Sequence, residues 1–279
     1  MEIPVPRIPL GDWVEVALDW ILAALGGVFT FIRTILVQAY ELLLWALTTP
    51  EWWMVTIVLA GLGWWLRSWQ LALGTVIGFV IIVGVNQWAN AMSTLALVAI
   101  ATLIAVIIAI PLGIWAAKSQ AASKILRPLM DFIQTMPPMV YLIPALVIFR
   151  VGVVPGMVAT VIFAMAPGVR FTELGIRGVD SEVVEAGKAF GSPPGKILRQ
   201  IQLPLALPTI MAGANQVIML SLSMVVIAGM VGAGGLGGEV VASLNRINAG
   251  LGFEAGLAVV ILAMYLDRLT SMQSKTKLS

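Results

Sequence analysis

Long apolar runs, separated by short polar or charged clusters, dominate the chain. No charged residue occurs between residues 68 and 117, a stretch too long for one membrane-spanning helix, which needs about 20 apolar residues. The polar cluster at 86–90 divides this stretch naturally. The pattern predicts an all-α polytopic membrane protein with about seven transmembrane helices, near 52–66, 70–85, 91–116, 129–149, 154–172, 205–230 and 251–267.

Residues 12–45 follow a different pattern, because their polar side chains form one stripe on the expected helix. The rest of that helix is Trp, Leu, Ile, Val and Phe, which is typical of an amphipathic helix lying in the membrane interface. Gly26-Gly27 is a candidate break, and a first span that tolerates its charges is the alternative. The stripe consists of Asp12, Glu15, Asp19, Gly26, Thr30, Arg33 and Glu41.

Composition agrees with lipid as the main solvent of this chain. Of its 279 residues, 11% are charged and 60% are hydrophobic, whereas soluble domains carry about 25% charged residues. The chain has no His and no Cys, which excludes disulfides, thiol nucleophiles and the usual zinc sites. The net charge of +2 is too small to argue for a nucleic-acid partner.

The distribution of Lys and Arg predicts the orientation in the membrane. If residues 118–127 are cytoplasmic, only Arg7, Arg33, Arg150 and Arg246 of the 16 basic residues fall outside. We therefore expect an extracytoplasmic N-terminal unit at 1–50, with a tail and the interfacial helix. A transmembrane domain at 51–272 and a cytoplasmic tail at 273–279 complete the chain.

The cytoplasmic segment 178–204 reads GVDSEVVEAGKAFGSPPGKILRQIQLP and predicts two short helices joined at a glycine. Ser181 is the expected N-cap of the first helix. Gly191 suits the position after that helix, because glycine adopts positive φ freely. Ser192 is the expected cap of a second helix, which starts at the next proline and ends at Pro204, where the next span begins.

The residues of this elbow suit docking against another protein. Ala186, Gly187 and Ala189 are small and would allow a partner to approach the backbone. Phe190 and Val183 could fill a pocket, since aromatic anchors dominate interface energetics. A solvated loop without a partner fits the spacing equally well.

The same segment resembles the EAA loop of ABC importer permeases, which reads E-A-A, three residues, G, nine residues, I-x-L-P. Every spacing fits, and the one departure is a glycine in place of the second alanine. In that family the loop inserts into a cleft on the ATPase subunit. The resemblance implies an ATPase-coupling loop made by Glu185, Ala186, Gly187, Gly191, Ile201, Leu203 and Pro204.

Further segments resemble the permease of glycine betaine/proline betaine importers, among them WANAMSTLALV (88–98), PLGIWAAKS (111–119) and RPLMDFIQTMPPMVYLIP (127–144). The resemblance implies a MetI-like ABC permease core that imports compatible solutes, with relatives for choline, carnitine or trimethylamine N-oxide. It also implies two copies of this subunit, two cytoplasmic ATPase subunits that bind ATP and Mg, and an extracytoplasmic binding protein. No cofactor is expected in the chain itself.

Two glycine-rich segments imitate nucleotide-binding motifs. Residues 232–237 satisfy G-x-G-x-x-G, but the preceding residues continue a span, whereas a dinucleotide site needs a strand before the motif. We expect a flexible break at the outer surface, either a helix end or part of a gate. Residues 191–197 miss the P-loop spacing, so ATP must be hydrolysed by another subunit.

Polar and methionine side chains within apolar spans are the candidates for the solute path. Intramembrane polar groups usually face protein or water, methionine surfaces adapt to varied shapes, and a tyrosine face attracts quaternary cations. Helix packing is the alternative role for each residue. The candidates are Gln134, Thr135, Met136, Met139, Tyr141, Asn215, Met219, Ser221 and Met224.

Three neighbouring features are expected to stabilise or shape the fold rather than to contact solute. Asp131 is expected to pair with Arg127, four residues before it, and Glu173 to stabilise the cytoplasmic loop. Pro137-Pro138 predicts a kink.

The expected mechanism is alternating access driven by the ATPase partner. An amino-acid ABC importer, an ion-coupled secondary transporter and a membrane subunit without transport are the alternatives.

Overall fold

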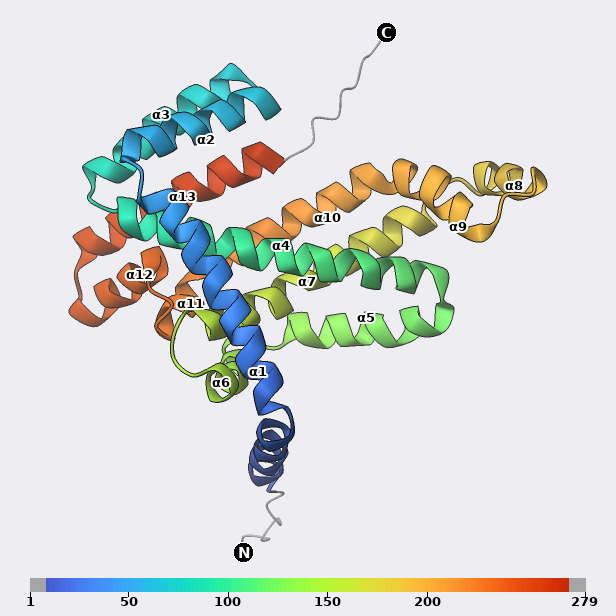
Figure 1. The fold of residues 1–279 in the computed structure, drawn as a ribbon, viewed down its shortest axis with the longest axis horizontal. Helices are drawn as coiled ribbons and strands as arrows, with labels where there is room; N and C mark the ends of the chain where they lie inside the picture. Colours follow the sequence, from blue (N-terminus) through green and yellow to red (C-terminus); the bar gives the residue numbers. More distant parts are fainter. Residues whose placement is uncertain (1–8, 271–279) are drawn as a thin grey trace, which may run out of the picture.

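The computed structural model describes residues 9–270, and every regular element in that range is a helix (Figure 1). The first eight residues of the expected outer tail and the whole expected cytoplasmic tail, 273–279, lie outside the described residues. Four long helices form the body, with α5 (Gln120–Thr135) beside them. They are α4 (Trp88–Lys118), α7 (Val153–Arg177), α10 (Leu203–Ser223) and α13 (Ala249–Thr270).

Helix α7 is the centre of the bundle and packs against α4 and α10. Small residues allow this close approach, as is typical of membrane helices. A Cβ atom built on Gly113 of α4 would lie 2.5 Å from the Cβ of Thr172, and one built on Gly213 of α10 would lie 2.6 Å from the Cβ of Phe171. Any side chain at either glycine would therefore push α4 or α10 away from α7.

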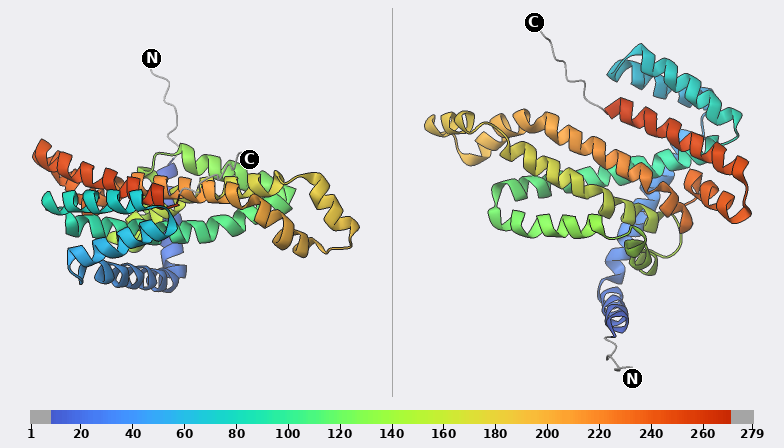
Figure 2. Two further views of the ribbon diagram at one scale, coloured as in Figure 1. Left: turned by 90° about the horizontal axis from the view of Figure 1, so that it is seen from above. Right: turned by 180° about the vertical axis from the view of Figure 1, so that it is seen from behind.

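The N-terminal segment is one helix, α1 (Leu10–Thr48), which crosses the bundle at an angle (Figures 1 and 2). The helix continues through the candidate break at Gly26-Gly27, because a glycine weakens a helix interior by only about 1 kcal/mol, but α1 bends sharply toward its N-terminal end (Figures 1 and 2). The second half packs on the bundle, with Leu36 buried and Phe29 edge-on to Phe149 at 5.8 Å. In the first half Trp13 and Trp20 are exposed, and the interfacial position of this half stays a prediction.

The expected number of seven spans is not confirmed. Five helices of the described range are long and apolar enough to cross a bilayer, one of them within α1, and a bent pair could add a sixth. The helices α2 (Trp52–Leu66) and α3 (Trp69–Gly84) have 15 and 16 residues. At 1.5 Å per residue they reach only about 24 Å, less than the roughly 30 Å of the hydrocarbon core.

The bent pair consists of α5 and α6 (Met139–Phe149), whose axes differ by 96°. The kink predicted at Pro137-Pro138 is confirmed. The hydroxyl of Tyr141 lies within hydrogen-bonding distance of the carbonyl oxygens of Ile133 and Met136, 2.8 Å from the latter. It thus satisfies carbonyl groups that lose their helical partners where α5 ends.

A second short unit, α11 (Val225–Met230) and α12 (Gly235–Arg246), closes the opposite end of the bundle from the elbow (Figure 1). The glycine-rich segment forms the turn between them, with positive φ at Gly232, Gly234 and Gly235. The turn is fixed to α4, because the backbone N–H of Leu236 donates to Thr94 Oγ1 at 2.9 Å. The segment therefore marks the end of a helix, which was one of the two expectations for it. The helix α12 that follows was not predicted.

Candidate functional site: a cytoplasmic coupling elbow

The first helix of the elbow is α8 (Ser181–Ala189), as the sequence predicts, but its cap is different. Asp180, not Ser181, is the N-cap residue, and its carboxylate accepts a hydrogen bond from the N–H of Glu182 at 2.8 Å. A carboxylate adds charge to this bond at the positive end of the helix dipole, which explains why Asp180 is preferred over the neighbouring hydroxyl.

The end of α8 has the geometry predicted for a glycine stop. Gly191 has φ +73°, and the two hydrogen bonds that define a Schellman motif are present. The N–H of Ser192 donates to the carbonyl of Gly187 at 3.1 Å, and the N–H of Gly191 donates to that of Lys188 at 2.8 Å. The direction of the chain after Phe190 is therefore fixed by backbone geometry.

The second helix, α9 (Pro194–Ile197), starts one residue later than predicted, and Ser192 makes no capping bond to it. Contrary to the expectation from the sequence, the helical conformation does not stop at Pro204. After α9 the chain continues through a π-helical turn, η1 (Leu198–Gln202), into α10. The N–H of Leu203 donates to the carbonyl of Leu198, and this wider turn leaves room for a proline ring that lacks an N–H.

The consequence is a continuous helical segment from Pro194 to Met230. The second arm of the elbow and the following span are one element, so a movement of the elbow moves α10 directly. This continuity could not be read from Pro204, because a proline normally disfavours helix at the preceding residue.

The motif residues divide into two faces. Gly187 is buried against Ile201 of the η1 turn, and both Ile201 and Leu203, the first residue of α10, are half-buried. Glu185 and Ala186 are exposed on the other face of α8. At the tip, 90% of Phe190 is exposed, and Val183 is exposed as well. The inner face holds the elbow together, and the side chains of Glu185 and Phe190 lie exposed outside this contact.

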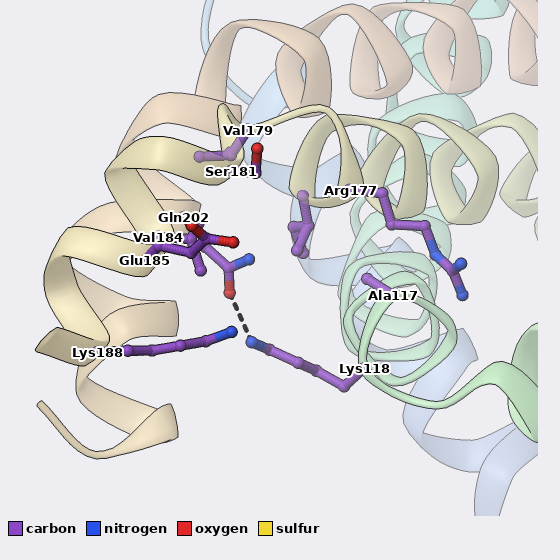
Figure 3. A pocket seen from close by; sticks show the side chains of 10 residues that line it. Ala117, Lys118, Arg177, Val179, Ser181, Val184, Glu185, Lys188 and Gln202 are labelled. Atoms are coloured by element: carbon purple, nitrogen blue, oxygen red, sulfur yellow. Dashed lines mark hydrogen bonds between the residues drawn. The ribbon is translucent and has the colours of Figure 1, made fainter.

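A cavity of about 210 Å³ lies in the crook between α8, the ends of α4 and α7, and η1 (Figure 3). Lys118 extends from the end of α4 and donates to Gln202 Oε1 at 2.5 Å. Lys188 of α8 points toward it from the opposite side of the cavity. Glu185 and Arg177 complete the charged part of the lining.

The end of α7 that carries the elbow is held by ion pairs from two partly exposed arginines to one buried carboxylate. Glu173 is buried and accepts hydrogen bonds from Ser123 at 2.7 Å and from Arg127 at 3.0 Å, and it pairs with Arg177 at 3.0 Å. The guanidinium of Arg177 also donates to the carbonyl of Ala116 at 2.8 Å. As expected, Glu173 stabilises the base of the elbow.

The expected pair between Arg127 and Asp131 was wrong. Arg127 pairs with Glu173, and Asp131 pairs with Arg170. Both contacts cross from α5 to α7, so the buried carboxylate of Glu173 receives the guanidinium that a local i,i+4 pair would have used. A buried carboxylate without a partner would cost more free energy than an exposed pair on one helix contributes.

The candidate path residues lie in different environments. Tyr141, Ser221 and Met224 are buried within the chain, while Thr135, Met139 and Met219 are exposed on its surface. Gln134 and Met136 are half-buried. The exposed members, on α5, α6 and α10, are the ones able to contact solute or a second subunit directly.

Asn215 has a structural role that the sequence did not indicate. Its side-chain N–H donates to Asp267 Oδ1 at 3.0 Å, and its Oδ1 accepts from Thr270 at 2.7 Å. These bonds join α10 to the end of α13. Sequence reasoning missed Asp267, Thr270, Lys118 and Gln202 because their partners are separated from them by 52 to 84 residues.

The apolar helical bundle has the features of a membrane-embedded subunit, and the elbow projects from its end. The family model described as the binding-protein-dependent transport system inner membrane component matches residues 109–274. This is more than half of the chain, and the chain therefore belongs to that family. It is a multi-pass inner-membrane permease subunit of an ABC importer, which acts together with ATP-binding and substrate-binding partners.

Curated relatives match nearly the whole chain. The glycine betaine transport system permease protein OpuAB of Bacillus subtilis is 46% identical over 95% of this chain and 94% of its own length. The glycine betaine/carnitine transport permease protein GbuB of Listeria monocytogenes is 46% identical over 97% of both chains. ProW of Escherichia coli, a glycine betaine/proline betaine permease, is 43% identical over 94% of this chain and 74% of its own length.

Among solved structures, the inward-facing MetNI methionine ABC transporter has a chain with a similar fold. The TM-score is 0.56 and the identity 22%, over 62% of this chain and 88% of that chain. A second crystal form gives a TM-score of 0.57. At this identity the likeness concerns the fold, and it confirms the expected MetI-like architecture.

Proposed function

We propose that this permease subunit imports glycine betaine or a related methylated amine. The observation that carries the proposal is the 46% identity to a glycine betaine permease over 95% of the chain, together with a complete coupling elbow. Similarity extends, at 35% identity, to a trimethylamine N-oxide permease of Ruegeria pomeroyi. Methionine transport is less favoured, since the likeness to that transporter is one of fold.

The working unit that we propose contains two copies of this chain, two ATP-binding subunits that hold ATP and Mg, and an external binding protein. The N-terminus would lie outside and the C-terminus in the cytoplasm. The charge distribution supports this orientation, because the elbow, with Lys188, Lys196 and Arg199, belongs on the cytoplasmic side. The solute path would run along the exposed path candidates, between the two copies.

Alternating access in this unit would start at the elbow. Closure of the ATP-binding subunits would displace α8 and α9, and α10 would follow because it continues from α9 without a break. The bonds of Asn215 to Asp267 and Thr270 would carry α13 along. The Tyr265 hydroxyl donates to the carbonyl of Leu59 at 3.0 Å, so α2 would move with α13.

The test of the solute class uses the substrate-binding protein that delivers solute to this permease. Its affinity would be measured for glycine betaine, choline, carnitine, proline and trimethylamine N-oxide. The loaded binding protein would then be added to the reconstituted complex, and ATP hydrolysis would be followed. We expect a methylated amine to bind and to stimulate hydrolysis. Stimulation only by an unmethylated amino acid would contradict the proposal.

A further inference from the structure

The crook of the elbow holds two like charges that face each other. Lys118 comes from the end of α4 and Lys188 from α8, and their ammonium groups converge in the same cavity (Figure 3). Like charges that point at each other in this way repel. In the part of the chain that the structure describes, neither ammonium has a carboxylate within ion-pairing distance.

The remaining polar groups of the lining do not neutralise this pair. Gln202 accepts a hydrogen bond from Lys118 but carries no charge. Arg177 also lines the cavity, but its guanidinium points away from the two lysines (Figure 3) and is paired with Glu173 and the carbonyl of Ala116. Glu185 supplies one carboxylate to the lining, so the cavity keeps an excess of positive charge.

The chemistry of the cavity argues against the transported solute as its occupant. A methylated amine is recognised by aromatic faces, and none of the described residues that line the cavity is aromatic. The excess positive charge would also repel a quaternary ammonium group. At about 210 Å³, the space suits one side chain rather than a drug-sized ligand, whose pockets start at roughly 300 Å³.

The position of the cavity indicates where the missing charge comes from. The cavity opens on the side of α8 that carries Glu185 and Lys188, and both residues line it and are exposed. A partner that covers this side of the helix therefore reaches Lys188. An anion between the two lysines would join α8 to α4. Docking would then be transmitted to the bundle through α4 as well as through α10.

We propose that the crook cavity receives an acidic side chain of the ATP-binding subunit, held between Lys118 and Lys188. The carboxylate removes the repulsion between the two ammonium groups, and charge-assisted hydrogen bonds to both of them fix it in place. This inference rests on the proposed function, because it requires the ATP-binding partner. It adds a polar contact to the docking surface formed by the EAA motif.

The direct test is zero-length crosslinking of the assembled complex with a carbodiimide, which joins an amine to a carboxylate in contact with it. Peptide mass spectrometry should find Lys118 or Lys188 joined to an Asp or Glu of the ATP-binding subunit. Lys124, exposed on α5 and absent from the cavity lining, serves as the control and should not show this crosslink. Crosslinks from Lys118 and Lys188 to Glu185 of the same chain alone would overturn the proposal.

A variant series gives an independent readout. Replacing both lysines by Gln should weaken binding of the ATP-binding subunit at low salt by at least about tenfold and flatten its salt dependence. Replacing both lysines by Arg, which keeps the charges, should preserve binding, and Lys124→Gln should not change it. Unchanged affinity of the double variant would overturn the inference while the proposed function stands.

Two further outcomes distinguish an error in the proposed function from an error in the proposed occupant of the cavity. Failure of the wild-type chain to assemble with any ATP-binding subunit would contradict the proposed function itself. An anionic lipid that co-purifies with the wild-type complex and is lost from the double variant would assign the cavity to a lipid phosphate instead, and would overturn the protein occupant.

Discussion

Gly187 of α8 lies directly against Ile201 of the π-helical turn. A Cβ atom built on Gly187 would be 2.8 Å from the Cδ1 atom of Ile201 and 3.6 Å from Cγ1 of Ile197. The glycine that departs from the family motif is therefore the point where the two arms of the elbow touch. The contact lets α8 rest on the segment that continues into α10.

This contact predicts a strong dependence on side-chain size at position 187. Gly187→Ala should be tolerated, because Ile201 Cδ1 ends a flexible side chain, and helix propensity offsets the strain by up to about 1 kcal/mol. Gly187→Leu should displace α8 and lower transport per ATP hydrolysed. Gly195→Leu is the control, since Gly195 has open space around it. Equal coupling ratios for both leucine variants would show that the contact is unimportant.

The prediction for position 191 depends on backbone conformation alone. No atom lies within 4 Å of a Cβ built there, but its φ is +73°, where a branched residue costs roughly 1–2 kcal/mol. Gly191→Val should therefore uncouple transport from ATP hydrolysis while the chain still inserts in the membrane. Gly191→Asn should keep most transport, since Asn adopts this conformation more readily. Wild-type uptake by the valine variant would refute the elbow assignment.

The sequence predicted the elbow better than the bundle, and the reason is physical. Motif spacing and the glycine stop depend on neighbouring residues, so α8 and the stop at Gly191 were confirmed. The partners of Arg127 and Asp131 are set by the crossing of α5 and α7, which no local pattern contains. The continuity through Pro204 depends on one π-helical turn, and hydropathy does not distinguish short helices such as α2 from complete spans.

The solute path can be tested with two residues of similar exposure. Met219 of α10 is 39% exposed and Val76 of α3 is 38% exposed. Met219→Trp should lower uptake in proteoliposomes several-fold without abolishing basal ATP hydrolysis, because the larger side chain would narrow the path. Val76→Trp should be mild. The reverse result, with Val76→Trp blocking uptake and Met219→Trp normal, would place the path elsewhere.

The position of α1 is testable by labelling from one side of the membrane. Single cysteines at Asp12, Asp19, Arg33 and Glu41 can be introduced because the chain has no Cys. All four should react with an impermeant thiol reagent from outside if the helix lies in the outer interface, since its polar stripe faces water. Reaction of positions 12 and 41 from opposite sides would instead establish α1 as a span.

The central claim is that this chain forms the path of an ATP-driven importer of methylated amines. Its most direct measurement is uptake of labelled glycine betaine by proteoliposomes that contain the permease with its ATP-binding subunit. ATP would be enclosed and the binding protein added outside. We predict accumulation that requires enclosed ATP and the binding protein and that persists when ion gradients are abolished. Accumulation without ATP, driven by an ion gradient, would contradict the account.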